Sequence, residues 1–216
     1  MGATLAIDTS AGTAVALMRN GMVVAEINHE HNMSHAESIG SAIAGVLAAS
    51  GLSAENVISV VVGRGPAPFT GLRVGIAAAM MFAEGAKAQL SGVVSLDAIA
   101  LTALKANDSI SESSPLLITT DARRKEVYYA LYSGLTDAGI PIRLEGPAVI
   151  KPAALSALLA ERGINPITTD AKITASAIAE LADALQREGL LKHDVTAMYL
   201  RAPDAVEGQF GKKVSG

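Results

Sequence analysis

The chain has 216 residues, a formal net charge of −4 at neutral pH and a pI of about 5.6. This acidic balance argues against a protein that binds the phosphate backbone of a nucleic acid by itself. It allows the chain to contribute a small part of a nucleic-acid-binding surface within a complex. There is no cysteine, which excludes disulfides, thiolate metal sites and cysteine nucleophiles. The N-terminus has no signal-peptide pattern, and the apolar stretch 74–83 is too short to span a bilayer, so we expect a cytoplasmic protein without membrane contact.

Three strands are predicted to open the chain, at residues 4–8, 13–18 and 22–27. Asn20-Gly21 lies between the second and the third, and this dipeptide is a strong signal for a two-residue hairpin. The pattern therefore predicts a mostly antiparallel start.

A helix with well-marked ends follows. Ser34 and Glu37 fit a capping box, and Gly51 fits the C-terminal stop. One face of this helix is an apolar stripe, and a second face carries small residues that would let another helix approach closely: Ser41, Ala44, Gly45 and Ala48.

Residues 57–62 form a continuous apolar run, which predicts a buried strand parallel to its neighbours. A glycine-rich turn leads from it into a helix over residues 70–86 that is apolar nearly all round. A helix without a polar face is buried on two sides. One side can cover the sheet, and the other needs a partner helix; the residues expected to meet that partner are Ala77, Ala78, Met81 and Phe82.

After a strand at 90–94 and a helix at 96–106, the polar stretch 107–114 marks the best boundary between two lobes, 1–107 and 108–216. The same order then repeats, with a loose tail from about residue 206. The second round consists of strands at 116–121, 126–132 and 140–144, a helix at 152–162, a strand at 164–168 and a helix at 172–188. Fold class is therefore α/β, with two βββαβα-like halves.

Each half begins with a strand that ends in an aspartate, Asp8 or Asp121, and this arrangement resembles the actin, hexokinase and Hsp70 architecture, in which a nucleotide lies between two lobes. Four segments resemble the TsaB family in order along the chain. They are Ala-Ile-Asp-Thr-Ser at 6–10, Gly-Pro-Ala-Pro-Phe-Thr-Gly-Leu-Arg-Val-Gly at 65–75, Asp-Ala-Arg-Arg-Lys-Glu-Val-Tyr at 121–128 and Tyr-Leu-Arg at 199–201.

The resemblance implies a noncatalytic subunit of the tRNA threonylcarbamoyladenosine machinery. Such a pseudoenzyme pairs with its catalytic paralogue TsaD, the pair is joined by the ATPase TsaE, and the subunit forms a homodimer when alone. It implies no cofactor of its own, with ADP or ATP at most at the complex interface, and little direct contact with tRNA.

Metal binding is not expected. In the catalytic paralogue, two metal-binding histidines four residues apart follow a Gly-Val strand end, and that pattern places Ser95 and Ile99 at the two positions in this chain. A serine hydroxyl is a weak ligand and isoleucine offers none. His31 and His35 also share this spacing, but they straddle the predicted helix cap beside His29, which favours a solvated loop over a zinc site.

Asp8, Thr9, Ser10 and Asp121 stand where this architecture places a phosphate or Mg²⁺ contact. The alternative, which we favour, is that both aspartates cap turns or hold the lobes together. The stretch 168–171 lacks the glycines that would let the backbone approach a nucleotide, and Pro68 removes a donor from the glycine-rich turn.

Two further patterns bear on function. Arg123, Arg124 and Lys125 form a basic turn that is either solvated or touches a partner or tRNA. Ser10, Ser34 and Ser95 lack the Gly-x-Ser-x-Gly elbow of a hydrolase, so protease activity is not expected. The competing hypotheses are a small ATP-dependent kinase or transferase of the same architecture, and a homodimeric structural protein with no paralogous partner.

Overall fold

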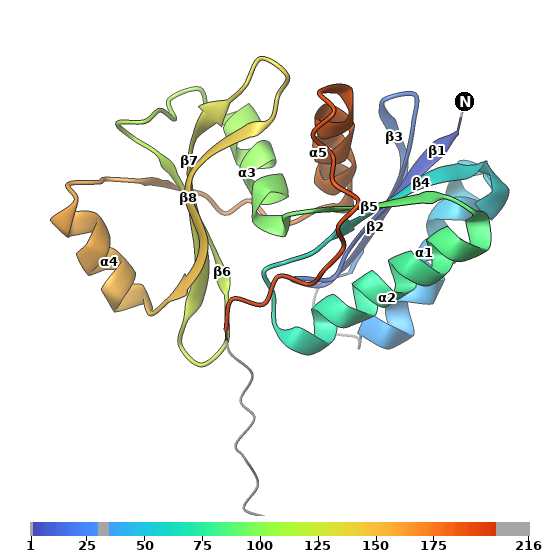
Figure 1. Ribbon diagram of the computed structural model, residues 1–216, viewed down its shortest axis with the longest axis horizontal. Helices are drawn as coiled ribbons and strands as arrows, with labels where there is room; N and C mark the ends of the chain where they lie inside the picture. The colour runs from blue at the N-terminus through green and yellow to red at the C-terminus, as the bar shows by residue number, and fades with distance from the viewer. Residues whose placement is uncertain (1, 30–34, 202–216) are drawn as a thin grey trace, which may run out of the picture.

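The computed structural model describes residues 2–29 and 35–201, apart from the side chains of residues 35–37 and 69. Helices and sheets alternate in layers across the molecule (Figure 1): two helices, a five-stranded sheet, two central helices, a four-stranded sheet and one outer helix. This confirms the predicted two-lobed α/β class.

The first sheet has the strand order β3-β2-β1-β4-β5. Its strands are β1 (Ala3–Asp8), β2 (Thr13–Arg19), β3 (Met22–His29), β4 (Val57–Gly63) and β5 (Gln89–Val93). Asn20 and Gly21 both have positive φ, 53° and 74°, as a tight hairpin turn requires, so the predicted hairpin is confirmed. β4 runs parallel to both β1 and β5, as its unbroken apolar run predicted.

One face of this sheet is covered by α1 (His35–Ser50) and α2 (Phe69–Ala86), which lie side by side. Because side chains alternate along a strand, Leu5 and Ile7 pack under these helices, whereas Ala6 faces the opposite layer. Gly51 ends α1 with φ of 66°, as predicted. The predicted capping box lies outside the described residues at Ser34 and at the side chain of Glu37.

The second sheet has the strand order β8-β7-β6-β9. Its elements are β6 (Leu116–Asp121), β7 (Val127–Leu135), β8 (Pro141–Ile150), the outer helix α4 (Pro152–Glu161) and β9 (Ile167–Thr168). The order of elements matches the predicted second round, but β8 is longer and β9 shorter than expected.

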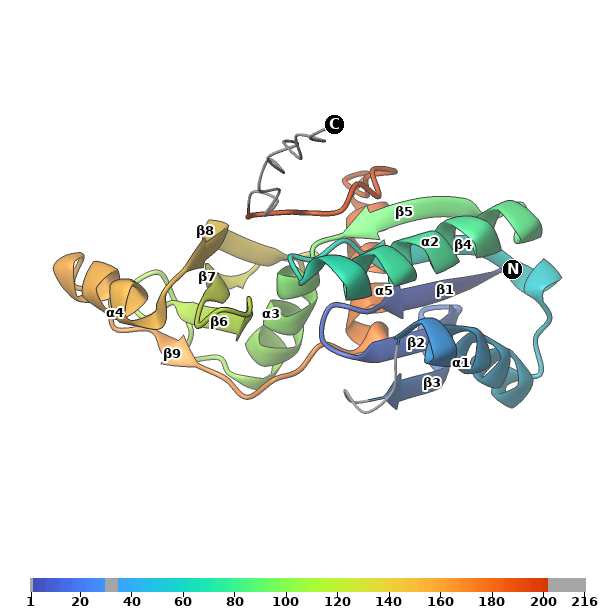
Figure 2. The same cartoon turned by 90° about the horizontal axis from the view of Figure 1, so that it is seen from below.

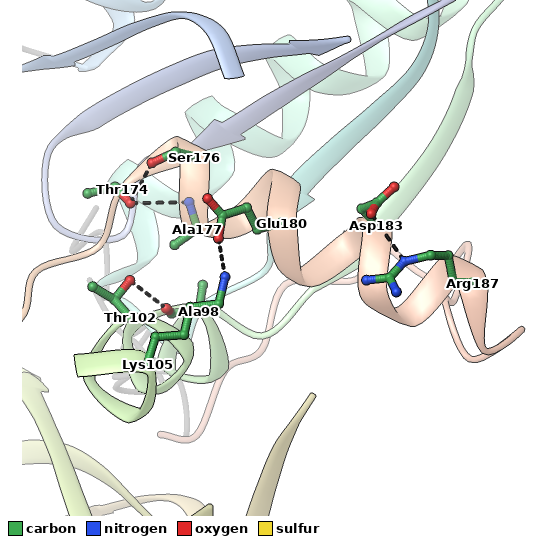
Figure 3. A network of polar contacts seen from close by, with 9 residues as sticks. All are labelled: Ala98, Thr102, Lys105, Thr174, Ser176, Ala177, Glu180, Asp183 and Arg187. Atoms are coloured by element: carbon green, nitrogen blue, oxygen red, sulfur yellow. Dashed lines mark hydrogen bonds and ion pairs between the residues drawn. The ribbon is translucent and has the colours of Figure 1, made fainter. Parts of the chain in front are cut away.

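The two halves exchange helices. α3 (Ser95–Ala106) belongs to the first half of the sequence but packs on β6, β7 and β8, whereas α5 (Ala175–Arg187), from the second half, packs on all five strands of the first sheet. Figure 3 shows the contact between them, where Lys105 Nζ of α3 reaches Glu180 Oε2 of α5 at 2.5 Å. Glu26 of β3 accepts a hydrogen bond of 2.8 Å from the backbone N–H of Ser176, which fixes the start of α5 to the first sheet.

After α5 the chain forms an extended segment, residues 191–201, which we call the strap. Figures 1 and 2 show it running from the edge of the first sheet to the second lobe. A bridge between Gly92 and Lys192 lets it cover part of the edge strand β5. Among the described residues, no helix has the length and apolar character needed to cross a membrane.

Candidate functional site: a motif junction and a helical docking face

The Asp8 carboxylate is buried at the end of β1 and takes part in a short polar network. Its Oδ1 accepts hydrogen bonds from the Ser10 N–H and hydroxyl at 2.7 and 2.5 Å, and its Oδ2 accepts one from the Ser95 hydroxyl at 2.6 Å. Ser95 and Gly65 are joined reciprocally, since Gly65 N–H donates to Ser95 Oγ and Ser95 N–H donates to Gly65 O. Asp8 therefore holds β1, the glycine-rich turn and α3 together.

The glycine-rich turn is shaped by this close approach. A Cβ on Gly63 would lie 1.8 Å from Asp8 Oδ2, and one on Gly75 would lie 2.2 Å from Thr9 Oγ1. The buried Thr9 hydroxyl in turn donates to Gly71 O at 2.8 Å. The glycines make room for Asp8 and Thr9, and this supports the structural interpretation of the turn over a phosphate cradle.

Asp121 is exposed and caps the turn between β6 and β7. Its Oδ1 accepts a hydrogen bond of 2.8 Å from the Arg123 N–H, and Oδ2 lies 3.5 Å from the Arg123 guanidinium. Arg123, Arg124 and Lys125 are exposed, and all three have left-handed backbone angles, with φ of 63°, 53° and 61°.

The strap joins the remaining motif segments. Arg73 Nε on α2 donates to the Tyr199 hydroxyl at 2.7 Å, and its guanidinium lies 5.4 Å from the centre of the Tyr199 ring. Arg201 forms an ion pair with Glu126 of the β6–β7 turn. All four segments singled out in the sequence are thus linked to their neighbours through side chains, and we call the region they form the motif junction.

A second polar network at the lobe interface was missed from the sequence. Asp97, in the first turn of α3, accepts hydrogen bonds from the Tyr132 hydroxyl at 2.7 Å and from Arg143 at 3.2 Å. Burial raises the pKa of Asp97 above its usual range, although Arg143, the Tyr132 hydroxyl and Arg64 oppose the shift. The signal that could have revealed it is a carboxylate placed between the apolar residues Leu96 and Ile99 of one helix.

The positions aligned with metal ligands lie inside the protein. Ser95 is 1% exposed and bonded to Asp8, and Ile99 is 4% exposed in the core between α3 and the second sheet. In the part of the chain that the structure describes, no group of three or more His, Asp or Glu side chains could hold a metal ion. His31 and the side chain of His35 lie outside that part.

A surface hollow of about 410 Å³ lies between α3 and α5, beside the Lys105–Glu180 ion pair drawn in Figure 3. Its charged lining residues, Lys105 and Glu180, pair with each other, and Thr174 accepts the Ala177 N–H as the cap of α5. The predicted phosphate residues do not line it.

The outer surface of α1 and α2 exposes several apolar side chains. Met81 is 78% exposed and Met80 50%, although both belong to a helix that covers the core with its other side. We define the docking face by the predicted partner residues on this layer. Ser41, Ala44, Ala48 and Ala77 are exposed, while Gly45, Ala78 and Phe82 are half-buried.

Gly45 differs from the rest of the set. A Cβ at this position would lie 2.6 Å from Ile27 Cδ1, so the residue faces β3 of its own sheet. Its small size lets α1 approach the sheet, and its predicted role in partner contact stays a prediction.

The sequence matches the family described as TsaD, tRNA N6-adenosine threonylcarbamoyltransferase, over residues 22–195. An uncharacterised protein of Mycobacterium tuberculosis H37Rv is 39% identical over 148 residues, which cover 67% of this chain and 63% of the relative. The tRNA threonylcarbamoyladenosine biosynthesis protein TsaB of Escherichia coli is 36% identical over 149 residues, or 68% of this chain and 62% of that protein. The matched region therefore spans slightly less than two thirds of the length of each of these two relatives.

Among solved structures, a Pseudomonas aeruginosa protein described as similar to the peptidase YeaZ superposes with a TM-score of 0.76 at 25% identity, covering 93% of this chain and all of that one. YeaZ from the same organism superposes with a TM-score of 0.75. The family match covers most of the chain and the fold agrees over nearly all of it. The chain belongs to the TsaD family, and within it to the TsaB/YeaZ type.

Proposed function

We propose that this protein is a noncatalytic subunit in the biosynthesis of threonylcarbamoyladenosine in tRNA. Its role is to bind a TsaD-type catalytic paralogue through the docking face and to stabilise that enzyme's active conformation. The assembled pair then forms part of the surface that a TsaE-type ATPase recognises. Without its partner, the chain uses the same face to form a homodimer.

The observation that carries this proposal is the exposed apolar layer of α1 and α2. Met80 and Met81 are exposed on α2, and Ala44 and Ala48 are exposed on α1, which packs beside it. Exposed apolar side chains on neighbouring elements mark candidate interaction sites. The small residues of α1 and the flexible methionines of α2 suit helix-on-helix packing, in which a short side chain admits the partner and a long one fills the remaining gap.

The motif junction supports a noncatalytic role. A general base or a metal ligand needs a carboxylate that faces the substrate. Asp8 is fully buried and bonded to Ser10 and Ser95, and Asp121 caps its own turn. These contacts stabilise the fold, and we propose that any ADP or ATP of the assembly is held mainly by the partner proteins.

The test places a charge on the docking face. Ala44→Glu and Met81→Glu each bring a carboxylate to an exposed position, so neither should unfold the chain, but the buried interface would have to desolvate the charge. We expect each variant to lose at least about tenfold in affinity for the TsaD-type partner, which corresponds to ~1.4 kcal/mol. Isothermal titration calorimetry measures this directly.

Met22→Glu is the matched control, because Met22 is 67% exposed on β3 rather than on the docking helices. It should bind the partner as tightly as the unaltered chain. Equal affinity for all three variants would show that the docking face is wrongly placed. Turnover of ATP by the purified chain alone would favour a kinase or transferase instead.

A further inference from the structure

Several cationic side chains follow one another along the motif junction, and we call this row the basic strip. At one end, Arg73 donates a hydrogen bond to Tyr199 of the strap. Two residues further along the strap, Arg201 forms an ion pair with Glu126, which follows Lys125 in the basic turn. Two residues of extended chain span about 7 Å, so these contacts are adjacent. The strip thus gathers five cationic side chains and two carboxylates, on a chain whose net charge is −4: Arg73, Arg123, Arg124, Lys125 and Arg201, with Asp121 and Glu126.

The backbone of the basic turn gives a second, independent observation. Arg123, Arg124 and Lys125 follow one another at positive φ, where side chains other than glycine are disfavoured by roughly 1 kcal/mol each. The turn itself is closed by backbone contacts, in which Ala122 N–H donates to Glu126 O and Glu126 N–H donates to Arg123 O. Glycine or asparagine would serve this geometry at lower cost, so the backbone conformation of the turn does not by itself require long cationic side chains.

Tyr199 adds an aromatic surface to the strip. Tyr199 is 38% exposed, although its hydroxyl accepts a hydrogen bond from Arg73 and the Arg73 guanidinium lies against its ring. An exposed aromatic ring among arginines and lysines is the combination that binds unpaired nucleotides, because the cations contact phosphates and the ring stacks on a base.

We propose that this basic strip contacts the tRNA substrate, with Arg124 and Lys125 on backbone phosphates and Tyr199 beside an unpaired nucleotide. The inference rests on the proposed function, since the RNA is presented by the assembly with the catalytic paralogue. Arg73 lies on α2, the helix whose Met81 belongs to the docking face. A partner bound at that face would therefore hold its RNA close to the basic strip. The contact adds to the affinity of the assembled complex for tRNA, and it is too small to bind RNA without the partner.

The test uses the assembled complex and unmodified tRNA. In the double variant Arg124→Gly, Lys125→Gly, two charges are lost while glycine suits the left-handed backbone, so the chain should fold at least as well as before. We expect tRNA affinity, measured by fluorescence anisotropy, to fall about tenfold at physiological salt. The slope of log K against log salt should become shallower by roughly 1 to 2.

Lys87→Gly is the matched control. Lys87 is also an exposed cation at positive φ, 54°, but it ends α2, about 21 Å along the helix from Arg73. Its tRNA affinity and salt slope should equal those of the unaltered complex. Both variants are first shown to bind the catalytic paralogue, so that a failure of docking is separated from a failure of RNA contact.

Unchanged affinity and slope in the double variant would overturn the inference. So would loss of a protein partner by that variant, because the strip would then be a protein contact. Unchanged tRNA affinity would leave the proposed docking face unaffected, because that face is tested by its own variants, Ala44→Glu and Met81→Glu.

Discussion

At the scale of single residues, the buried aspartate explains the glycines around it. Asp8 lies under the glycine-rich turn and bonds Ser10 and Ser95, so the backbone at Gly63 has no room for a side chain. From the sequence, Asp8 could be assigned to a strand end, and a structural role was favoured over a phosphate contact. Its partner Ser95 could not be predicted, because 87 residues separate the two in sequence.

Gly63→Ala should destabilise the protein strongly. Its Cβ would lie 1.8 Å from Asp8 Oδ2, which forces the buried network apart at a cost of about 3 kcal/mol. For a chain of this size, that corresponds to a melting temperature lower by roughly 10 °C. Differential scanning calorimetry provides the measurement.

Gly40→Ala serves as its control. Gly40 lies within α1 with open space at the Cβ position, so alanine should raise stability by about 0.5–1 kcal/mol. If the two variants melted at the same temperature, the Asp8 network would not constrain the turn as described.

At the scale of elements, local patterns predicted nearly all strands and helices, but not where α3, α5 and the strap pack. Hairpin and cap signals depend on neighbouring residues, as at Asn20-Gly21 and Gly51. The exchange of α3 and α5 depends on contacts between distant segments, and so do Asp97–Tyr132 and Arg201–Glu126. The motif segments were visible in the sequence, but the bonds that join them were not.

Asp194 anchors the strap and gives it a pH dependence. Hydrogen bonds from Thr196, together with the bond and charge of Arg64, lower the pKa of Asp194 from 3.8 to about 2. A carboxylate with a depressed folded-state pKa contributes stability above its unfolded pKa and loses that contribution as the pH falls through the folded value.

Asp194→Asn should therefore melt below the unaltered protein at pH 7, and the difference should shrink below about pH 4 and disappear below about pH 2. Melting temperatures across this pH range test the expectation. Asp108→Asn, in the loop after α3, removes a charge outside the strap and controls for net charge. A difference that stayed constant with pH would rule out the carboxylate as the anchor.

At the scale of the whole molecule, the helix exchange ties the two lobes into one unit. Neither sheet is covered on its inner face without a helix contributed by the other half of the sequence. Separation of the lobes would expose the apolar faces of α3 and α5 at once, so the lobes should unfold together.

The tyrosines allow this cooperativity to be measured. Tyr128, Tyr129 and Tyr132 lie on β7 and Tyr199 on the strap, and the chain has no tryptophan. Intrinsic fluorescence thus reports on the second sheet and the strap, while far-UV circular dichroism reports on all helices. We expect the two urea transitions to coincide, and separate midpoints would show that the lobes unfold independently.

The central claim is that the chain acts by docking on a catalytic paralogue. Reconstituted tRNA modification tests it most directly, with the TsaD-type enzyme and its ATPase supplied in the presence of the unaltered chain, of Met81→Glu, or of no added chain. With the subunit supplied at a concentration near its affinity for the enzyme, we expect most product with the unaltered chain, clearly less with Met81→Glu, and background levels without the subunit. Equal product in all three reactions would contradict it.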